Sequence, residues 1–260
     1  MPEKFDPIEY NFNGRKEVQN MGENTSKAFS GKAESRAVQD LYNETPKIFS
    51  NEIKKRLMPD RQYTIADIGS FKGELLKQIC DMLPEYKLKG IAMDINKKIL
   101  KENNFKLRIA SKAEEMPFND RSIDVEIMRY VLQWNYPKNQ KMILKEISRT
   151  IKEFALVEHA GADNENSKEW RKKHDKLYNG EEISKLKRGE HYFSSRDEIE
   201  TWMKDENISF ERIGEKRISG AEEVFTERFG LDANNKSKVK EILKDKGFFI
   251  KTTWIIFPKK

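Results

Sequence analysis

The chain has 260 residues, 37% of them hydrophobic and 36% charged, which is enough to bury the core of one large domain. No apolar run approaches the roughly 18 residues of a membrane span, and the N-terminus lacks the basic-then-apolar layout of a signal peptide. The single cysteine, Cys80, excludes an internal disulfide, so we expect a globular protein of the reducing cytoplasm.

The net charge of +6 arises from 50 basic and 44 acidic residues that are mixed along the whole chain. Nucleic-acid-binding proteins more often concentrate their positive charge in a stripe or a tail. Basic clusters at 171–173 and 185–188 have acidic neighbours. The pattern therefore favours a well-solvated, lysine-rich surface, and nucleic acid is the less favoured partner.

Residues 1–25 are polar and without periodicity, which predicts an arm or loop. Apolar residues then recur at helical spacing from 35 to 57, and Thr45 followed by Pro46 divides them into two predicted short helices. Further along, short apolar runs alternate with amphipathic stretches. The alternation predicts strands at 64–69, 88–94, 105–110, 122–130 and 153–159, and helices at 73–83, 97–103 and 138–151. A parallel sheet with helices on both faces is the expected architecture.

The alternation breaks after the fifth predicted strand, where residues 162–190 are polar and lysine-rich. Ser195 and Glu198 then form a capping-box pattern that opens a helix through Trp202. A strand at 207–217, helices near 220–229 and 235–246, and a strand at 248–257 complete the prediction. We divide the chain into an N-terminal arm and helical lid (1–58), a cofactor-binding core (59–161), a helical insertion or lid (162–206) and a C-terminal part of the same sheet (207–260).

The most informative segment is a strand–turn–helix pattern over residues 63–76. The strand ends on Asp67, and Gly69 and Gly73 follow in the turn. Glycine suits this position because the backbone must bend sharply and come close to a ligand. The next strand ends on Asp94, where a carboxylate can accept hydrogen bonds from both hydroxyls of a ribose. These features predict an adenosine-containing cofactor.

Four segments in this order resemble the class I S-adenosylmethionine-dependent methyltransferases. Residues 67–73 resemble the first motif of that family, and Asp94 matches its ribose-binding acid. Residues 113–125 resemble the loop-and-strand segment of the family, and the longer segment 113–134 resembles the branch that methylates small metabolites. Residues 130–134 lie where these enzymes have an aliphatic-aromatic turn after the fourth strand. Four ordered matches are far more specific than one glycine motif.

The resemblance implies an α/β fold: a doubly wound, mostly parallel, seven-stranded Rossmann-like sheet whose last strand runs antiparallel. It also implies S-adenosylmethionine as cofactor, S-adenosylhomocysteine as product, and in-line transfer of a methyl group to a small-molecule acceptor. In this reading Asp67 orients the cofactor's amino group, Asp94 holds the ribose, and Ile95 packs on the adenine. The implied cofactor-binding residues are Asp67, Gly69, Ser70, Gly73, Asp94, Ile95, Ala113, Glu114, Arg129 and Tyr130.

Two positions depart from the family pattern. Phe71 stands where relatives usually carry a small residue, and it would cost about 1–2 kcal/mol if the turn requires a positive φ. Lys112 stands where many relatives carry an aspartate that recognises adenine, and a lysine accepts no hydrogen bond. A non-catalytic protein that binds the cofactor or its product is therefore an alternative, beside an RNA or protein methyltransferase. A nicotinamide-binding turn fits less well, because it requires Gly-x-Gly-x-x-Gly.

Methyl transfer mainly requires alignment of donor and acceptor, with removal of a proton where the acceptor needs it. His159, at the end of the fifth strand, is a candidate general base, although a histidine that only lines the rim is the commoner case. Glu158 competes for that role. Tyr42 and Trp134 are candidate lid and substrate residues, with core packing as the alternative for Trp134. No histidine or cysteine has partners at ligand spacing, so no metal site is predicted.

Overall fold

The computed structural model describes residues 8–9, 36–162, 192–219 and 248–259, together with positions 234 and 237. One sheet organises this part of the chain, with the strand order β1-β4-β3-β2-β5-β6-β8-β7. Seven of its strands correspond to the predicted ones: β2 (Gln62–Ile68), β3 (Lys87–Asp94), β4 (Leu107–Ala110), β5 (Ile123–Arg129), β6 (Ile151–Ala162), β7 (Phe210–Ser219) and β8 (Phe248–Ile256). The eighth, β1 (Ile8–Glu9), adds a two-residue edge where the sequence predicted only an arm or loop.

The sheet is parallel except at one strand. β8 runs antiparallel to both of its neighbours, β6 and β7, whereas the pairs formed by β1 through β6 are parallel. This confirms the mostly parallel seven-stranded fold with an antiparallel last strand. Because β2 through β6 run the same way, their carboxyl ends lie at one edge, called the carboxyl edge below. Ligands of open α/β sheets bind at this edge.

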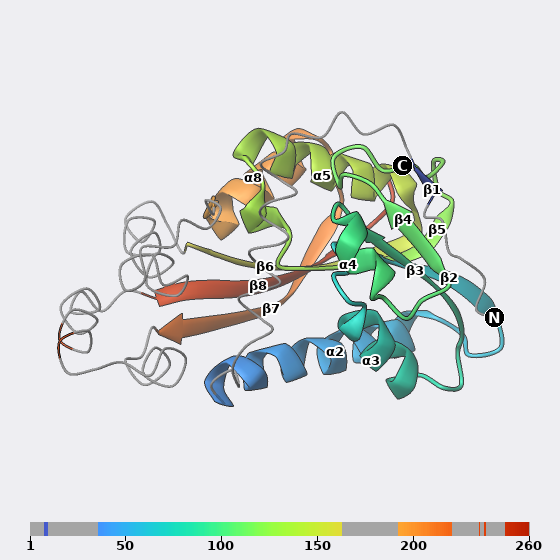
Figure 1. Cartoon of the computed structure of the whole chain (residues 1–260). Coiled ribbons are helices and arrows are strands. Elements are labelled where there is room, and N and C mark those ends of the chain that lie inside the picture. Colours follow the sequence, from blue (N-terminus) through green and yellow to red (C-terminus); the bar gives the residue numbers. More distant parts are fainter. Residues whose placement is uncertain are drawn as a thin grey trace.

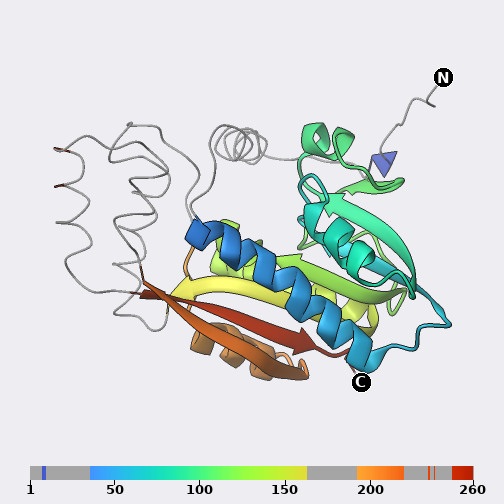
Figure 2. The same ribbon diagram turned by 90° about the horizontal axis from the view of Figure 1, so that it is seen from below.

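Helices cover both faces of the sheet (Figures 1 and 2). The helices are α2 (Arg36–Arg56), α3 (Glu74–Met82), α4 (Lys97–Lys101), the 3₁₀ turn η1 (Leu132–Trp134), α5 (Pro137–Thr150) and α8 (Arg196–Asp205). On one face α2 and α3 bury Phe49, Ile53 and Leu76 against β2, β5 and β6. On the other face, α5 and α8 bury Ile143 and Ile199 among other apolar residues. Burial of these two apolar layers holds the sheet between its helices.

The break predicted at Thr45–Pro46 is wrong, because α2 continues through it as one helix of 21 residues. Proline lacks one backbone donor and crowds the preceding turn, which usually kinks or ends a helix. Here the following turns bury Phe49 and Ile53 completely, and Thr45 is itself buried. Packing against the sheet outweighs the local preference of proline.

Several predictions fall outside the described residues. These are the N-terminal arm apart from β1, most of the insertion at 162–206, and the helices near 220–229 and 235–246. The helix predicted after Ser195 is α8, and its capping box is formed by Ser195 and Glu198 as expected. None of the described helices has the length and apolar character needed to cross a membrane.

Candidate active site

The glycine turn at the end of β2 is held by backbone hydrogen bonds. The amides of Gly69 and Ser70 both donate to the carbonyl of Met93 at the end of β3, over 2.8 and 2.9 Å. Gly69 adopts φ 74° and Gly73 φ 84°, in the left-handed region that favours glycine. A Cβ added to Gly69 would lie 2.3 Å from the Val131 side chain. Val131, two residues after the end of β5, therefore packs directly on this turn.

Asn103 is a residue of this turn that sequence analysis missed. Its side-chain amide donates to the Phe71 carbonyl over 3.2 Å and to the Ser70 hydroxyl over 3.4 Å. A Cβ on Gly73 would lie 2.8 Å from the same amide group. The second glycine is thus required by the approach of Asn103, a contact for which the sequence contains no local signal.

Phe71 adopts φ 50°, so the left-handed conformation considered for this position is present. Its amide donates to Asp94 Oδ2 over 2.9 Å. Together with the contact from Asn103, this hydrogen bond stabilises a conformation that costs a non-glycine residue about 1–2 kcal/mol. The departure from the family pattern is therefore accommodated by the turn.

Asp67 lies at the centre of the carboxyl edge, only 1% exposed. One carboxylate oxygen accepts the backbone N–H of Leu76, while Oδ2 has no hydrogen-bond partner among the described residues. Burial raises the pKa of Asp67 to about 7; the Arg129 guanidinium opposes this rise, and the Asp94 carboxylate adds to it. A buried oxygen without a partner suits a cationic donor such as the cofactor's ammonium group.

Asp94 links the glycine turn to the end of β3. Its Oδ2 accepts the N–H of Phe71, and its Oδ1 accepts the N–H of Asn96 over 2.8 Å. Burial raises the pKa of Asp94, although the N–H groups of Asn96, Phe71 and Ile95 favour its charged form. Each carboxylate oxygen retains capacity for a further hydrogen bond, so ribose hydroxyls can still be accepted. Ile95 follows directly and is half-buried.

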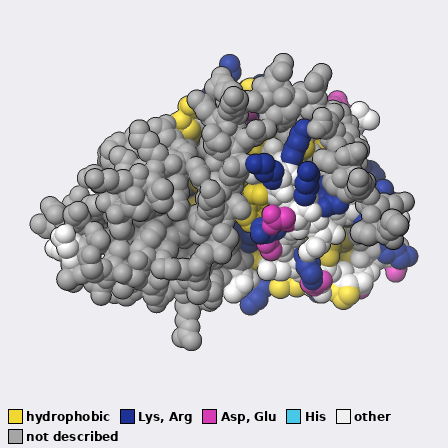
Figure 3. All heavy atoms as spheres, viewed as in Figure 1, with side chains coloured by type: hydrophobic (Ala, Val, Ile, Leu, Met, Phe, Trp, Pro, Cys, Tyr) yellow, Lys and Arg dark blue, Asp and Glu magenta, His cyan; other side chains and the backbone are white. Residues whose placement is uncertain are grey.

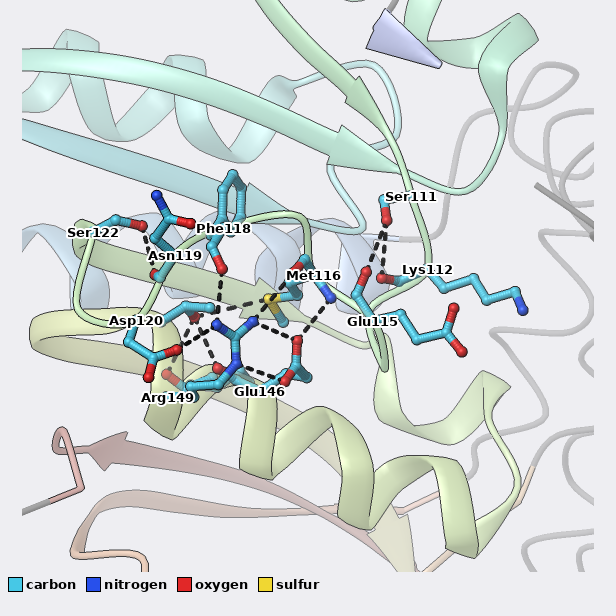
Figure 4. A network of polar contacts seen from close by, with 12 residues as sticks. Ser111, Lys112, Glu115, Met116, Phe118, Asn119, Asp120, Ser122, Glu146 and Arg149 are labelled. Carbon is cyan, nitrogen blue, oxygen red and sulfur yellow. Dashed lines mark hydrogen bonds and ion pairs between the residues drawn. The ribbon is translucent and has the colours of Figure 1, made fainter. Parts of the chain in front are cut away.

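The segment with Ala113 and Glu114 is shaped by one arginine beneath it (Figure 4). Arg149 donates to the carbonyls of Met116 and Phe118 and pairs with Glu146. Glu146 in turn accepts the N–H of Met116 over 2.8 Å. This network fixes the loop after β4 from below, so that its upper part lies at the carboxyl edge. The Lys112 side chain extends away from the network in Figure 4.

Arg129 and Tyr130 close the end of β5. Arg129 lies opposite Glu158 in the β5–β6 register, and its charge acts on Asp67. Tyr130 has φ 59°, a strained conformation for a large side chain, and its N–H donates to the Glu158 carbonyl over 3.0 Å. The chain therefore turns sharply at this point and passes across the edge toward η1.

His159 is buried on β6 and faces the segment that enters α8. Its Nε2 lies 3.0 Å from the Ser194 carbonyl, so this nitrogen carries the proton and donates. A general-base role would therefore fall on Nδ1. The adjacent Glu158 is fully buried, paired with Lys251 over 3.2 Å, and accepts the Thr45 hydroxyl over 2.8 Å. The ion pair is a second feature that sequence analysis missed.

The two predicted lid residues come from different elements. Trp134 belongs to η1, directly after the end of β5, and is half-buried. Tyr42 lies on the first part of α2, and its side chain is outside the described residues. In the part of the chain that the structure covers, no three His, Cys, Asp or Glu side chains are grouped to hold a metal ion.

The residues at the carboxyl edge fit S-adenosylmethionine. The unpartnered oxygen of Asp67 suits its ammonium group, and the turn with positive φ at Gly69 and Gly73 follows Asp67 in the chain. The carboxylate of Asp94 suits its ribose. These assignments rest on chemistry and position and stay proposals for each residue.

Comparison with known proteins supports this picture. Residues 66–156 match the family model described as a methyltransferase domain. None of the curated protein sequences compared with the chain matches it. The YcgJ protein from Bacillus subtilis shares the fold with a TM-score of 0.63 and 13% identity, over 84% of this chain and all of that one.

Geranyl diphosphate C-methyltransferase from Streptomyces coelicolor, in complex with Mg²⁺, geranyl diphosphate and S-adenosyl-L-homocysteine, has a TM-score of 0.55. It is 10% identical over 83% of this chain and 79% of its own. Residues 66–156 therefore carry a methyltransferase domain, and the sheet that contains them shares its fold with these two solved structures.

Proposed function

We propose that this methyltransferase acts on a small-molecule acceptor that binds over the ends of β5 and β6. The described residues that cross this part of the edge are largely uncharged and aromatic, with Tyr130, Trp134 and Tyr136 in close succession. A relative of the same fold acts on the small molecule geranyl diphosphate. Both observations support a small acceptor over a macromolecular one.

The cofactor supplies a methyl group on a sulfonium centre, which is activated for in-line displacement. We assign the ammonium contact to Asp67 and the ribose contact to Asp94. Gly69, Ser70 and Gly73 would approach the methionine part through their backbone, and the remaining residues would border the adenine and the transferred group: Ile95, Ala113, Glu114, Arg129 and Tyr130. Their task is to align the two reactants and exclude water.

Removal of a proton is required only for some acceptors. His159 is the candidate for that role, because it lies near the end of β6 and imidazole is the side-chain group that most often accepts a proton in catalysis. Its Nε2–H donates a hydrogen bond to the Ser194 carbonyl. Nδ1 is therefore the ring nitrogen that can accept a proton. Tyr42 and Trp134 would cover the acceptor as lid residues.

The single observation that carries the cofactor assignment is the buried Oδ2 of Asp67 beside the glycine turn. Calorimetric titration with S-adenosylmethionine and S-adenosylhomocysteine tests it. Micromolar binding that weakens at least about tenfold in Asp67→Ala is expected, since a charge-assisted hydrogen bond is lost. Absence of binding to the wild-type chain would overturn the assignment. A screen of small acceptors with methyl-labelled cofactor then tests the acceptor class.

An RNA acceptor is the second candidate, and one surface feature favours it. Three of the five residues of α4 are Lys97, Lys98 and Lys101, and Lys and Arg side chains gather over this region in Figure 3. Binding to RNA through such lysines would weaken steeply with added salt. If a structured RNA does not bind at low salt, the RNA acceptor is excluded and the small-molecule acceptor remains.

The fourfold division of the chain also stays a proposal, with limits at residues 58, 161 and 206. β8 pairs with β6, and β7 pairs with β8, in one sheet, which supports counting 207–260 as part of the same domain.

We propose a cytoplasmic location, supported by a single cysteine in the whole sequence. Fluorescence microscopy of a tagged chain would test the location.

A further inference from the structure

A pair of tyrosines, Tyr136 exposed and Tyr192 half-buried, lies at the carboxyl edge. Tyr136 is 53% exposed, and its ring centroid lies 4.3 Å from that of Tyr192, with the planes tilted by 39°. The other exposed large hydrophobic side chains of the described part are Met58, Met82 and Leu107. Those three precede β2, precede β3 or begin β4, so they lie at the opposite edge of the sheet. Among these exposed side chains of the described residues, only Tyr136 shares the edge where a ligand is expected.

The aromatic pair is built on a rigid frame. The N–H of Tyr192 donates to the Gln133 carbonyl over 2.7 Å. The side-chain amide of Gln140 donates to the carbonyls of both Asn135 and Tyr192, over 2.8 and 3.1 Å. One buried side chain thus joins the two segments that carry the rings. Such a frame holds the rings in place before any ligand arrives, which lowers the entropy lost on binding.

His159 anchors the same segment two residues further along. Its Nε2 donates to the Ser194 carbonyl over 3.0 Å. A Cβ on Gly161 would lie 2.3 Å from that carbonyl and 2.5 Å from Nε2, so only glycine permits the approach. The segment from Tyr192 to Ser195 is therefore held at both ends, by Gln133 and Gln140 at Tyr192 and by His159 of β6 at Ser194.

The frame connects directly to the cofactor turn. Val131 packs on Gly69, and the Asn135 side chain donates to the Val131 carbonyl over 2.9 Å. Tyr136 is the next residue. The pair thus lies beyond the end of β5, on the side of the edge away from β3 and Asp94.

We propose that Tyr136 and Tyr192 form an aromatic wall that binds a planar apolar group of the acceptor, with His159 as the residue that positions the wall. This inference rests on the proposed small-molecule acceptor. Aromatic rings bind flat apolar groups by stacking and burial of both surfaces. The acceptor would therefore carry an aromatic or similarly flat apolar group next to the atom that receives the methyl.

The test uses the full chain saturated with S-adenosylhomocysteine and saturation-transfer NMR with 2-naphthol, with D-glucose as the polar probe. We expect binding of 2-naphthol but not of glucose. Tyr136→Ala should weaken 2-naphthol binding about three- to tenfold, whereas Tyr136→Phe should retain it, because the ring rather than the hydroxyl stacks. Met58→Ala, at the opposite edge and 67% exposed, is the matched control and should change nothing.

Substitution of His159 separates positioning from plain packing. His159→Gln can keep a donor toward the Ser194 carbonyl and should preserve 2-naphthol binding, whereas His159→Ala should weaken it. Affinity for S-adenosylhomocysteine should stay unchanged in both. If 2-naphthol fails to bind the loaded wild-type chain, or binds Tyr136→Ala equally well, the aromatic wall is wrong. If S-adenosylhomocysteine itself fails to bind, the proposed function fails instead.

Discussion

The two halves of the carboxyl edge are held by different kinds of contact. On the half proposed for the cofactor, between β2 and β3 and called the cofactor half, the backbone of the turn supplies the main donors: the amides of Gly69 and Ser70 reach the Met93 carbonyl, and the Phe71 N–H reaches the Asp94 carboxylate. On the half proposed for the acceptor, around β6 and called the acceptor half, buried side chains add an ion pair to the backbone contacts. Lys251 on β8 lies 3.2 Å from both Glu158 and Glu44, and so joins the sheet to α2.

This difference has a chemical reason. A cofactor that is the same in every family member can be bound by backbone groups, whose positions depend on the turn rather than on side chains. An acceptor that differs between enzymes must be recognised by side chains. Stability and affinity at the cofactor half should therefore depend on backbone conformation. At the acceptor half they should depend on individual side-chain contacts.

The largest effect is expected from Lys251→Met. The lysine is 3% exposed, and its removal leaves the fully buried Glu158 without its counter-charge. We expect a loss of about 3–5 kcal/mol in the free energy of unfolding, measured by urea denaturation. Adding Glu158→Gln should recover much of that loss, since no buried charge is then left unpaired.

Lys216→Met provides the control for this substitution. Lys216 also pairs with Glu44 over 3.2 Å, but both side chains are exposed. Its removal should cost less than about 1 kcal/mol. Equal effects of the two lysine substitutions would show that the buried pair does not hold the acceptor half together.

A smaller effect is expected from Gly69→Ala on the cofactor half. A left-handed φ costs alanine about 1–2 kcal/mol, and the overlap with Val131 adds about 1–3 kcal/mol. Thermal and urea unfolding would measure the sum. Gly214→Ala is the matched control, because its Cβ would meet Thr253 only at 3.7 Å. A Gly69→Ala variant as stable as this control would contradict the backbone account of the turn.

The cofactor half was also the more predictable from sequence. Its strand-ending acids and glycines form a local pattern in the sequence, although two of the contacts that they make, Gly69 with Met93 and Asp94 with Phe71, join neighbouring strand ends. The capping box at Ser195 is local in the same sense. The strand pattern followed from apolar periodicity, and the observed order places β8 as the antiparallel strand.

What the sequence did not reveal depends on contacts between distant residues. Lys251 reads as one charge within an apolar strand, and nothing local shows that Glu158 will meet it. Asn103 looks like an ordinary helix-end residue until Gly73 lies against it. Pro46 suggested a helix break because the burial of Phe49 on the sheet is a tertiary effect.

Next in size is the effect of Asp94→Ala on cofactor affinity. Charge-assisted hydrogen bonds to the ribose would be lost, and we expect binding of S-adenosylhomocysteine to weaken by about 1–3 kcal/mol in calorimetry. Asp124→Ala is the control: this aspartate accepts the Thr64 N–H over 2.7 Å, but at the start of β5 and the opposite edge. It should lower stability without changing cofactor affinity. An unchanged dissociation constant in Asp94→Ala would remove Asp94 from the cofactor site.

The last effect is a pH dependence at Glu126, on the strand that separates the two halves. Its side chain is fully buried, one oxygen accepts the Thr150 hydroxyl, and the other has no hydrogen-bond partner among the described residues. Burial raises the pKa of Glu126 from 4.5 to about 8, against the hydrogen bond from Thr150, which favours the charged form. The folded chain therefore keeps this proton across a pH range in which the unfolded chain has lost it.

Because the unfolded state binds fewer protons in this range, stability should fall as pH rises from about 4.5 to about 8. Glu126→Gln removes the titration, so the variant should be more stable than wild type at pH 8 by at least about 1 kcal/mol and similar to it near pH 4.5. Urea denaturation across this range measures the difference, with the exposed Glu153→Gln as the control for loss of one negative charge. A constant difference between Glu126→Gln and wild type across the range would mean that Glu126 is already ionised in the folded chain. Solvent or a movement of β5 would then have to offset the cost of burying the charged carboxylate. A movement of β5 would affect both halves of the edge, because this strand lies between them.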